Sequence, residues 1–101
     1  MGHKDVEKSE LHKTDQYIFE RDVEWLKLSD VMVADVTMPS LGVGYEIGFA
    51  ETLGIPILCL FNPKYKKALS AMVSGNKKLI CKEYNTLDEA KHILDQFLSS
   101  I

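Results

Sequence analysis

Two acidic side chains, Asp22 and Glu46, interrupt the apolar faces of two predicted helices. At the helical spacing of 100° per residue, each acid projects between two groups of apolar side chains. A carboxylate in such surroundings is costly unless it is paired, solvated in a cleft or used in a reaction. A cap or an ion pair would explain either acid alone. Two such acids beside a glycine-rich turn favour a functional site.

Two carboxylates that face a glycosidic bond are able to cleave it. One attacks the sugar as nucleophile, and the other serves as general acid and base. A separation of roughly 5 Å between the two carboxyl groups would predict retention of configuration through a covalent intermediate. Asp22 and Glu46 are therefore candidates for glycosyl chemistry, at a separation that the sequence does not give.

The segment before Glu46 is a turn rich in proline, serine and glycine (TMPSLGVGYEIG, residues 37–48). Ser40 is the natural N-cap of the helix that follows, and this structural role is enough to explain it. Gly42 and Gly44 leave the backbone open, so a phosphate could rest on the amides of residues 41–44 together with the Ser40 hydroxyl. The spacing matches neither GxGxxG nor a P-loop with its lysine, which excludes a generic dinucleotide or ATP site.

Three apolar runs predict the strands that position these residues, at residues 31–36, 57–61 and 78–83. We expect the first of them to be fully buried. Helices are predicted over about residues 14–28, 42–53 and 64–74, with Gly54 as a left-handed stop. A final helix begins after the capping box at Thr86. One helix followed by three strand-helix pairs predicts an α/β fold with a parallel sheet and right-handed crossovers.

The chain has 101 residues, of which 46% are hydrophobic and 27% charged, as expected for one small globular domain. Residues 1–13 show no periodicity and are predicted to form a flexible arm. Residues 14–101 are predicted to form a single α/β domain. Because three parallel strands are few for a sheet covered on both faces, we expect this domain to be partial, with its amino-terminal part missing.

Composition argues against several classes of function. The formal net charge is −3 and there is no basic stripe, so no nucleic-acid polymer is expected as a partner. Cys59 and Cys81 lie in apolar runs without zinc-site spacing and are predicted to be buried, reduced thiols, and the scattered histidines predict no metal. No apolar run is long enough to cross a bilayer, and residues 1–15 do not read as a signal peptide. We therefore expect no membrane association and a location in the cytoplasm, with the nucleus as the alternative.

Several segments together resemble the 2′-deoxynucleoside 5′-phosphate N-hydrolases of the nucleoside 2-deoxyribosyltransferase family. They are residues 22–26 (DVEWL), 29–37 (SDVMVADVT) and 39–48 (PSLGVGYEIG), and the match extends through residues 57–61 and 68–72 (ALSAM). The resemblance implies a flavodoxin-like or Rossmann-like three-layer fold, here with about three strands. It also implies hydrolysis of the N-glycosidic bond of 2′-deoxynucleoside 5′-monophosphates to a free base and 2-deoxyribose 5-phosphate, without a metal or organic cofactor.

Roles for individual residues follow from the same resemblance. Glu46 matches the nucleophile that attacks the anomeric carbon, and Asp22 matches the acid that orients the sugar or assists base departure and water attack. Ser40 and Gly42 match the groups that hold the 5′-phosphate. Ser70 matches a serine that reaches the phosphate in the neighbouring subunit of a homodimer, although on a helix flank it would otherwise be ordinary surface.

Family members begin with a strand, a Gly-Ser turn carrying a tyrosine, a helix and a second strand, and this chain does not contain that segment. The missing first strand would lie beside residues 31–36, and Asp35 is expected to support the site from behind. Two alternatives stay open. One is a deoxyribosyltransferase that passes the sugar to another base. The other is an inactive, truncated nucleotide-binding and dimerising domain.

Overall fold

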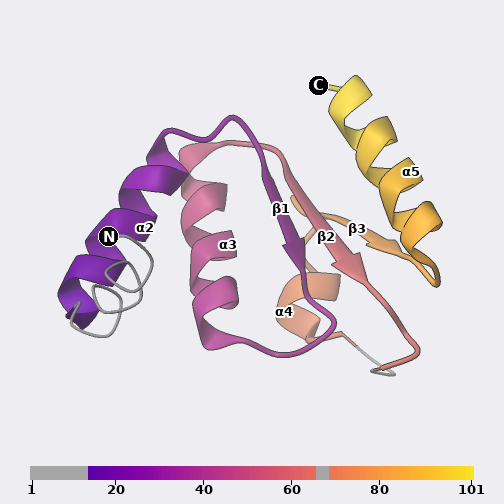
Figure 1. The fold of residues 1–101 in the computed structure, drawn as a ribbon, viewed down its shortest axis with the longest axis horizontal. Helices are drawn as coiled ribbons and strands as arrows, with labels where there is room; N and C mark the ends of the chain where they lie inside the picture. The colour runs from indigo at the N-terminus through magenta and orange to yellow at the C-terminus, as the bar shows by residue number, and fades with distance from the viewer. Residues whose placement is uncertain (1–13, 66–68) are drawn as a thin grey trace, which may run out of the picture.

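The computed structural model describes residues 14–65 and 69–101, so the predicted flexible arm at residues 1–13 lies outside the described residues. The elements follow one another along the chain as a helix and then three strand-helix pairs, which is the predicted order (Figure 1). They are α2 (Asp15–Lys27), β1 (Met32–Asp35), α3 (Leu41–Leu53), β2 (Ile57–Phe61), α4 (Ala71–Ser74), β3 (Ile80–Glu83) and α5 (Leu87–Ser99).

The three strands form one parallel sheet in the order β1-β2-β3. β2 lies in the centre and is almost wholly buried, as its continuous apolar sequence predicts. The prediction that the first strand is also fully buried is wrong, because Val33 is 41% exposed. β1 lies at one edge of the sheet and pairs only with β2 among the described strands, so it is covered less completely.

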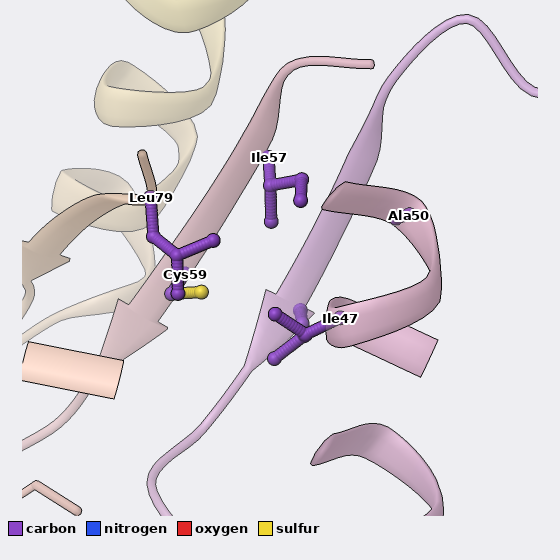
Figure 2. Close-up of a cluster of buried hydrophobic side chains, with 6 residues drawn as sticks. Ile47, Ala50, Ile57, Cys59 and Leu79 are labelled. Carbon is purple, nitrogen blue, oxygen red and sulfur yellow. The ribbon is translucent and has the colours of Figure 1, made fainter. Parts of the chain in front are cut away.

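Helices cover both faces of the sheet, which confirms the three-layer α/β architecture. On one face, side chains of the sheet point toward Ile47 and Ala50 of α3, as Figure 2 shows for Ile57 and Cys59 of β2. On the other face, Phe97 of α5 lies near Leu58 and Ile80. The neighbours Leu58 and Cys59 of β2 therefore point to opposite faces, as alternation along a strand requires.

α2 packs beside α3 (Figure 1). Most of the residues of α2 are exposed. Its contact with α3 includes the Phe19 ring, whose centroid lies 5.8 Å from that of Tyr45. The predicted apolar face of α2 is not a buried face in the described structure, because no residue of this helix is buried and Trp25 is 58% exposed. A single neighbouring helix covers only a narrow stripe of a helix surface.

The predicted helix over residues 64–74 is wrong, because α4 contains only four residues. Two polar side chains bind the backbone locally and replace helical hydrogen bonds. The backbone N–H of Lys64 donates to Asn62 Oδ1 at 3.0 Å, which forms a turn directly after β2. The backbone N–H of Met72 donates to Ser70 Oγ at 3.1 Å, so Ser70 precedes the helix as its N-cap.

The other predicted boundaries agree with the structure to within about two residues, as usual for element ends. Gly54 ends α3 with φ of 76°, in the predicted left-handed conformation. Thr86 caps α5, accepting from the backbone N–H of Glu89 at 3.2 Å. Within the described ranges, each helix is too short or too polar to span a bilayer.

Candidate active site

The connection from β1 to α3 carries the predicted phosphate-binding groups. Ser40 is in an extended conformation, and its Oγ accepts from the backbone N–H of Val43 at 3.2 Å, so the predicted N-cap is confirmed. A Cβ added at Gly42 would meet only the Ser40 Oγ at 3.9 Å, and one added at Gly44 would meet nothing within 4 Å. Packing among the described residues therefore does not require either glycine. Glycine is unfavourable inside a helix, and both positions leave the backbone open to an approaching group.

A cavity of about 510 Å³ opens between this connection, α3 and α4. Its size fits a small-molecule site. Ser40 and Ser70 both line it, so two of the predicted phosphate-binding residues face one cavity within a single chain. Most of the remaining lining is apolar, with Thr37, Glu51 and Asn76 as the other polar members.

Glu46 lies on a different flank of α3 and does not line this cavity. By helical spacing its side chain falls between Ala50, which is buried against the sheet, and Phe49, which stacks with Tyr45 on the side of α2. Glu46 is partly buried, and no hydrogen bond or ion pair joins it to another residue that the structure describes. A partly buried carboxylate without a structural partner fits a residue held for chemistry.

Asp22 differs from Glu46 in having a partner. Its Oδ1 lies 3.3 Å from Arg21 Nε, and the Arg21 guanidinium lies over the Trp25 ring at 4.7 Å from the ring centroid. The ion-pair alternative is therefore what the structure shows for Asp22. The two acids lie on neighbouring helices, and within residues 14–65 and 69–101 no direct bond joins them. Their roles in catalysis stay predictions.

Behind the cavity wall, polar residues join the ends of all three strands. Asp35 accepts from the Thr37 backbone N–H at 2.9 Å and from the Tyr84 hydroxyl at 2.5 Å. Thr37 Oγ1 in turn accepts from the backbone N–H of Asn62 at 2.9 Å. Thr37 and Asn62 are only 6% and 7% exposed, so this part of the network is buried, whereas Asp35 is exposed and its bond to Tyr84 lies at the surface. Asp35 is a predicted supporting residue, whereas the sequence analysis missed Thr37, Asn62 and Tyr84.

The hydrogen bonds of this network shift the pKa values of the Asp35 carboxyl and the Tyr84 phenol. Burial alone would raise the pKa of Asp35, but hydrogen bonds from Thr37 and Tyr84 lower it to below its ordinary value. The pKa of Tyr84 is raised, chiefly because its hydroxyl donates to Asp35. At neutral pH the pair is therefore an ionised Asp35 that accepts from a neutral Tyr84.

The cysteines show no sign of a reactive or metal-binding centre. Both are free, Cys59 being buried and Cys81 half-buried. Burial, with Cys81 beside it, raises the pKa of Cys59 to about 12. The part of the chain that the structure describes has no group of three or more metal-binding side chains.

Comparison with known proteins identifies the family. The sequence profile of the nucleoside 2-deoxyribosyltransferase family matches residues 2–90. The chain therefore belongs to this family. A zebrafish (Danio rerio) protein named 5-hydroxymethyl-dUMP N-hydrolase is 45% identical over 97 residues, which cover 94% of this chain and 68% of the relative.

Two further relatives carry similar names. The mouse (Mus musculus) 5-hydroxymethyl-dUMP N-hydrolase is 62% identical over 61 residues, covering 60% of this chain and 35% of the mouse protein. A protein from Syntrophotalea carbinolica, named putative 2′-deoxynucleoside 5′-phosphate N-hydrolase 1, is 42% identical over 87 residues, covering 86% of this chain and 61% of the relative. The chain thus spans about a third to two thirds of the length of these relatives.

A solved structure supports the fold independently. The Clostridium botulinum CMP N-glycosidase superposes with a TM-score of 0.71 over 86% of this chain and 73% of the glycosidase, at 22% sequence identity. At this level of identity the likeness establishes the fold only.

Proposed function

We propose that the protein hydrolyses the N-glycosidic bond of 2′-deoxynucleoside 5′-monophosphates, which releases a free base and 2-deoxyribose 5-phosphate. Family membership and the names of the relatives support this substrate class, and 5-hydroxymethyl-dUMP is the first substrate to test. The observation that carries the proposal is the structure of the β1–α3 connection. It combines a serine-capped helix start with two glycines that packing among the described residues does not require, on the helix that also bears Glu46, which has no partner among those residues.

In the proposed mechanism, the Glu46 carboxylate attacks C1′ of the sugar, and the C1′–N bond breaks as a glycosyl ester forms. The bonding electrons leave with the base, which is protonated by Asp22 or by water. Water then attacks C1′, its proton passes to Asp22 or to solvent, and the Glu46 carboxylate is regenerated. The Arg21 side chain, whose Nε lies 3.3 Å from Asp22 Oδ1, would orient Asp22 during these steps.

The phosphate would bind at the start of α3, where free backbone N–H groups and the helix dipole attract anions. Ser40 and Gly42 would contact it there. Ser70 faces the same cavity as Ser40 in one chain. In a homodimer, as we propose for this protein, Ser70 would reach the phosphate held by the neighbouring subunit. A nucleotide substrate fits a cytoplasmic or nuclear location.

Two other functions use the same residues. A nucleoside 2-deoxyribosyltransferase would pass the sugar from Glu46 to a second base, but an enzyme acting on free nucleosides has no need of two serines that hold a phosphate. An inactive nucleotide-binding and dimerising domain would bind monophosphates without cleaving them. The short span of the chain relative to its relatives favours testing this third function directly.

The deciding experiment incubates the chain with 5-hydroxymethyl-dUMP, the four common deoxynucleoside monophosphates and the matching nucleosides, with and without an added acceptor base. Chromatography measures the free base and any new nucleoside. Base release from monophosphates alone supports the hydrolase. A new nucleoside formed with the acceptor base supports the transferase. Binding in calorimetry without base release supports the inactive domain.

A further inference from the structure

Tyr84 is linked through Asp35 to the segment that forms one wall of the candidate site. β1 ends at Asp35, and residues 36–40 then form part of the cavity wall before α3 begins. Neither Asp35 nor Tyr84 lines the cavity. Tyr84 directly follows β3, and its hydroxyl donates to Asp35 Oδ2 at 2.5 Å. The two residues are 49 positions apart in the sequence. The contact of Tyr84 with the site is therefore indirect.

The hydrogen bonds continue from Asp35 into the wall itself. Asp35 Oδ1 holds the Thr37 N–H at 2.9 Å, and Thr37 Oγ1 holds the Asn62 N–H at 2.9 Å. The backbone N–H of Tyr84 also donates to the carbonyl of Phe61 at 3.0 Å, which fixes the base of its side chain. The segment between β1 and Ser40 is thus hydrogen-bonded to the ends of both other strands. Asp35 bonds to Tyr84 after β3, and Thr37 bonds to Asn62 after β2.

Resting on the proposed function, we infer that Tyr84 is a positioning residue that acts through Asp35 to hold the connection of residues 36–40, and so places Ser40 for the substrate phosphate. A hydrogen bond to a charged acceptor is stronger than one between neutral groups. Loss of the hydroxyl should loosen the wall while leaving the acid on α3 in place. The effect should therefore fall on substrate binding and not on the chemical step.

The test compares Tyr84→Phe with Tyr65→Phe in the full chain. Tyr65 is exposed, its ring lies 5.6 Å from Lys64 Nζ, and no hydrogen bond links its hydroxyl to residues 36–40. Tyr84→Phe should raise KM for the deoxynucleoside monophosphate by about tenfold and change kcat by less than about twofold. Hydrogen–deuterium exchange of the Thr37 backbone amide should accelerate by a similar factor, while the backbone amides within α5 keep their wild-type exchange rates. Tyr65→Phe should change none of these values.

A double-mutant cycle tests whether Tyr84 acts through Asp35. In an Asp35→Ala background, Tyr84→Phe should have no further effect on KM or on Thr37 exchange, because the acceptor is already gone. Additive effects would overturn the inferred route. Wild-type KM and Thr37 exchange in Tyr84→Phe would overturn the positioning role altogether.

The same samples separate this inference from the proposed function. If the wild-type chain binds the monophosphate without releasing base, the hydrolase proposal fails, and a dissociation constant replaces KM in the comparison. If an active chain keeps its KM in Tyr84→Phe, only the positioning role fails. If the wild-type chain neither binds nor cleaves the monophosphate, both are overturned.

Discussion

Glu46 and Asp22 have different surroundings, and this difference separates their expected behaviour. Glu46 is partly buried without a partner among the described residues, whereas Asp22 is paired with Arg21. Substitution of Glu46 should therefore leave the fold intact, while substitution of Asp22 removes an existing contact.

We predict that Glu46→Gln abolishes N-glycosidase activity, because the amide keeps the size of the side chain but does not form the sugar ester. Free-base release measures the activity, and circular dichroism with thermal melting monitors the fold. Glu24→Gln is the matched control, since Glu24 is exposed and, among the described residues, its side chain pairs with Lys27 at the surface. Unchanged turnover in Glu46→Gln would remove this residue from the mechanism.

Asp22→Asn should lower turnover steeply while changing stability little. The helix face around Asp22 is not buried, so neutralising the charge relieves no desolvation penalty, and the lost ion pair with Arg21 is worth about 1 kcal/mol at most. Steady-state kinetics and urea unfolding measure the two effects. Wild-type turnover together with lower stability would reduce Asp22 to a structural acid.

Cys59 should make the stability depend on alkaline pH. Its pKa is raised from 9.0 to about 12 in the folded protein, so above pH 9 the unfolded chain loses this proton while the folded chain keeps it. Stability is therefore fully present below about pH 9 and falls as the pH rises toward 12, by up to about 1.4 kcal/mol per unit. Urea unfolding at several alkaline pH values should show a shallower decline in Cys59→Ala than in the wild type. Equal slopes would contradict this assignment.

At the scale of elements, the N-cap residue of α3 has two roles. Ser40 caps the helix in the structure and holds the phosphate in the proposed function. Ser40→Ala should cost about 1 kcal/mol of stability, as should Thr86→Ala at the start of α5, whereas Ser40→Gly should cost only a few tenths.

Binding then separates the two roles of Ser40. Both Ser40 variants should raise KM for the monophosphate, while Thr86→Ala should leave KM unchanged because α5 does not line the cavity. Kinetics and thermal melting on the same preparations measure both quantities. A wild-type KM in Ser40→Gly would confine Ser40 to its capping role.

The sequence predicts an element well when residues close to it in the chain determine its structure. The central strand, the Ser40 cap and the Gly54 stop each follow from residues within one turn of the chain, and all three are predicted correctly. The helix at residues 64–74 is mispredicted because Asn62 and Ser70 bind nearby backbone groups, a competition that apolar periodicity does not register.

The residues of the candidate site also differ in whether neighbouring residues in the sequence identify them. Ser40 and Gly42 stand out in the sequence because one segment holds both. Tyr84 does not stand out in the sequence, because its proposed role depends on a hydrogen bond to Asp35, which belongs to another strand. The only available signal is that Asp35, Asn62 and Tyr84 each end or follow a predicted strand, and parallel strands end at the same edge of a sheet. The exposure of α2 does not follow from its apolar pattern, because it depends on which elements lie around the helix.

At the scale of the whole molecule, β1 lies at the edge of the sheet that the described strands form, and its apolar Val33 is exposed. Such edges pair with other chains unless they are covered or charged. We predict that the chain self-associates with rising concentration and that Val33→Lys lowers the weight-average mass in sedimentation equilibrium.

Leu87→Lys is the control for that experiment, since Leu87 is 69% exposed at the start of α5 and lies on no strand. It should associate as the wild type does. A wild-type chain that stays monomeric at the highest concentration would show that the β1 edge is protected.

The hydrogen bond between Asp35 and Tyr84 also sets an order of assembly. Its two residues are 49 positions apart, and contacts between distant residues form late in folding because the intervening chain must first be closed into a loop. The segment before Ser40 therefore acquires its final shape only after β3 has joined the sheet. During refolding, ligand binding should return after the helical signal, and the site should be among the last parts of the molecule to form.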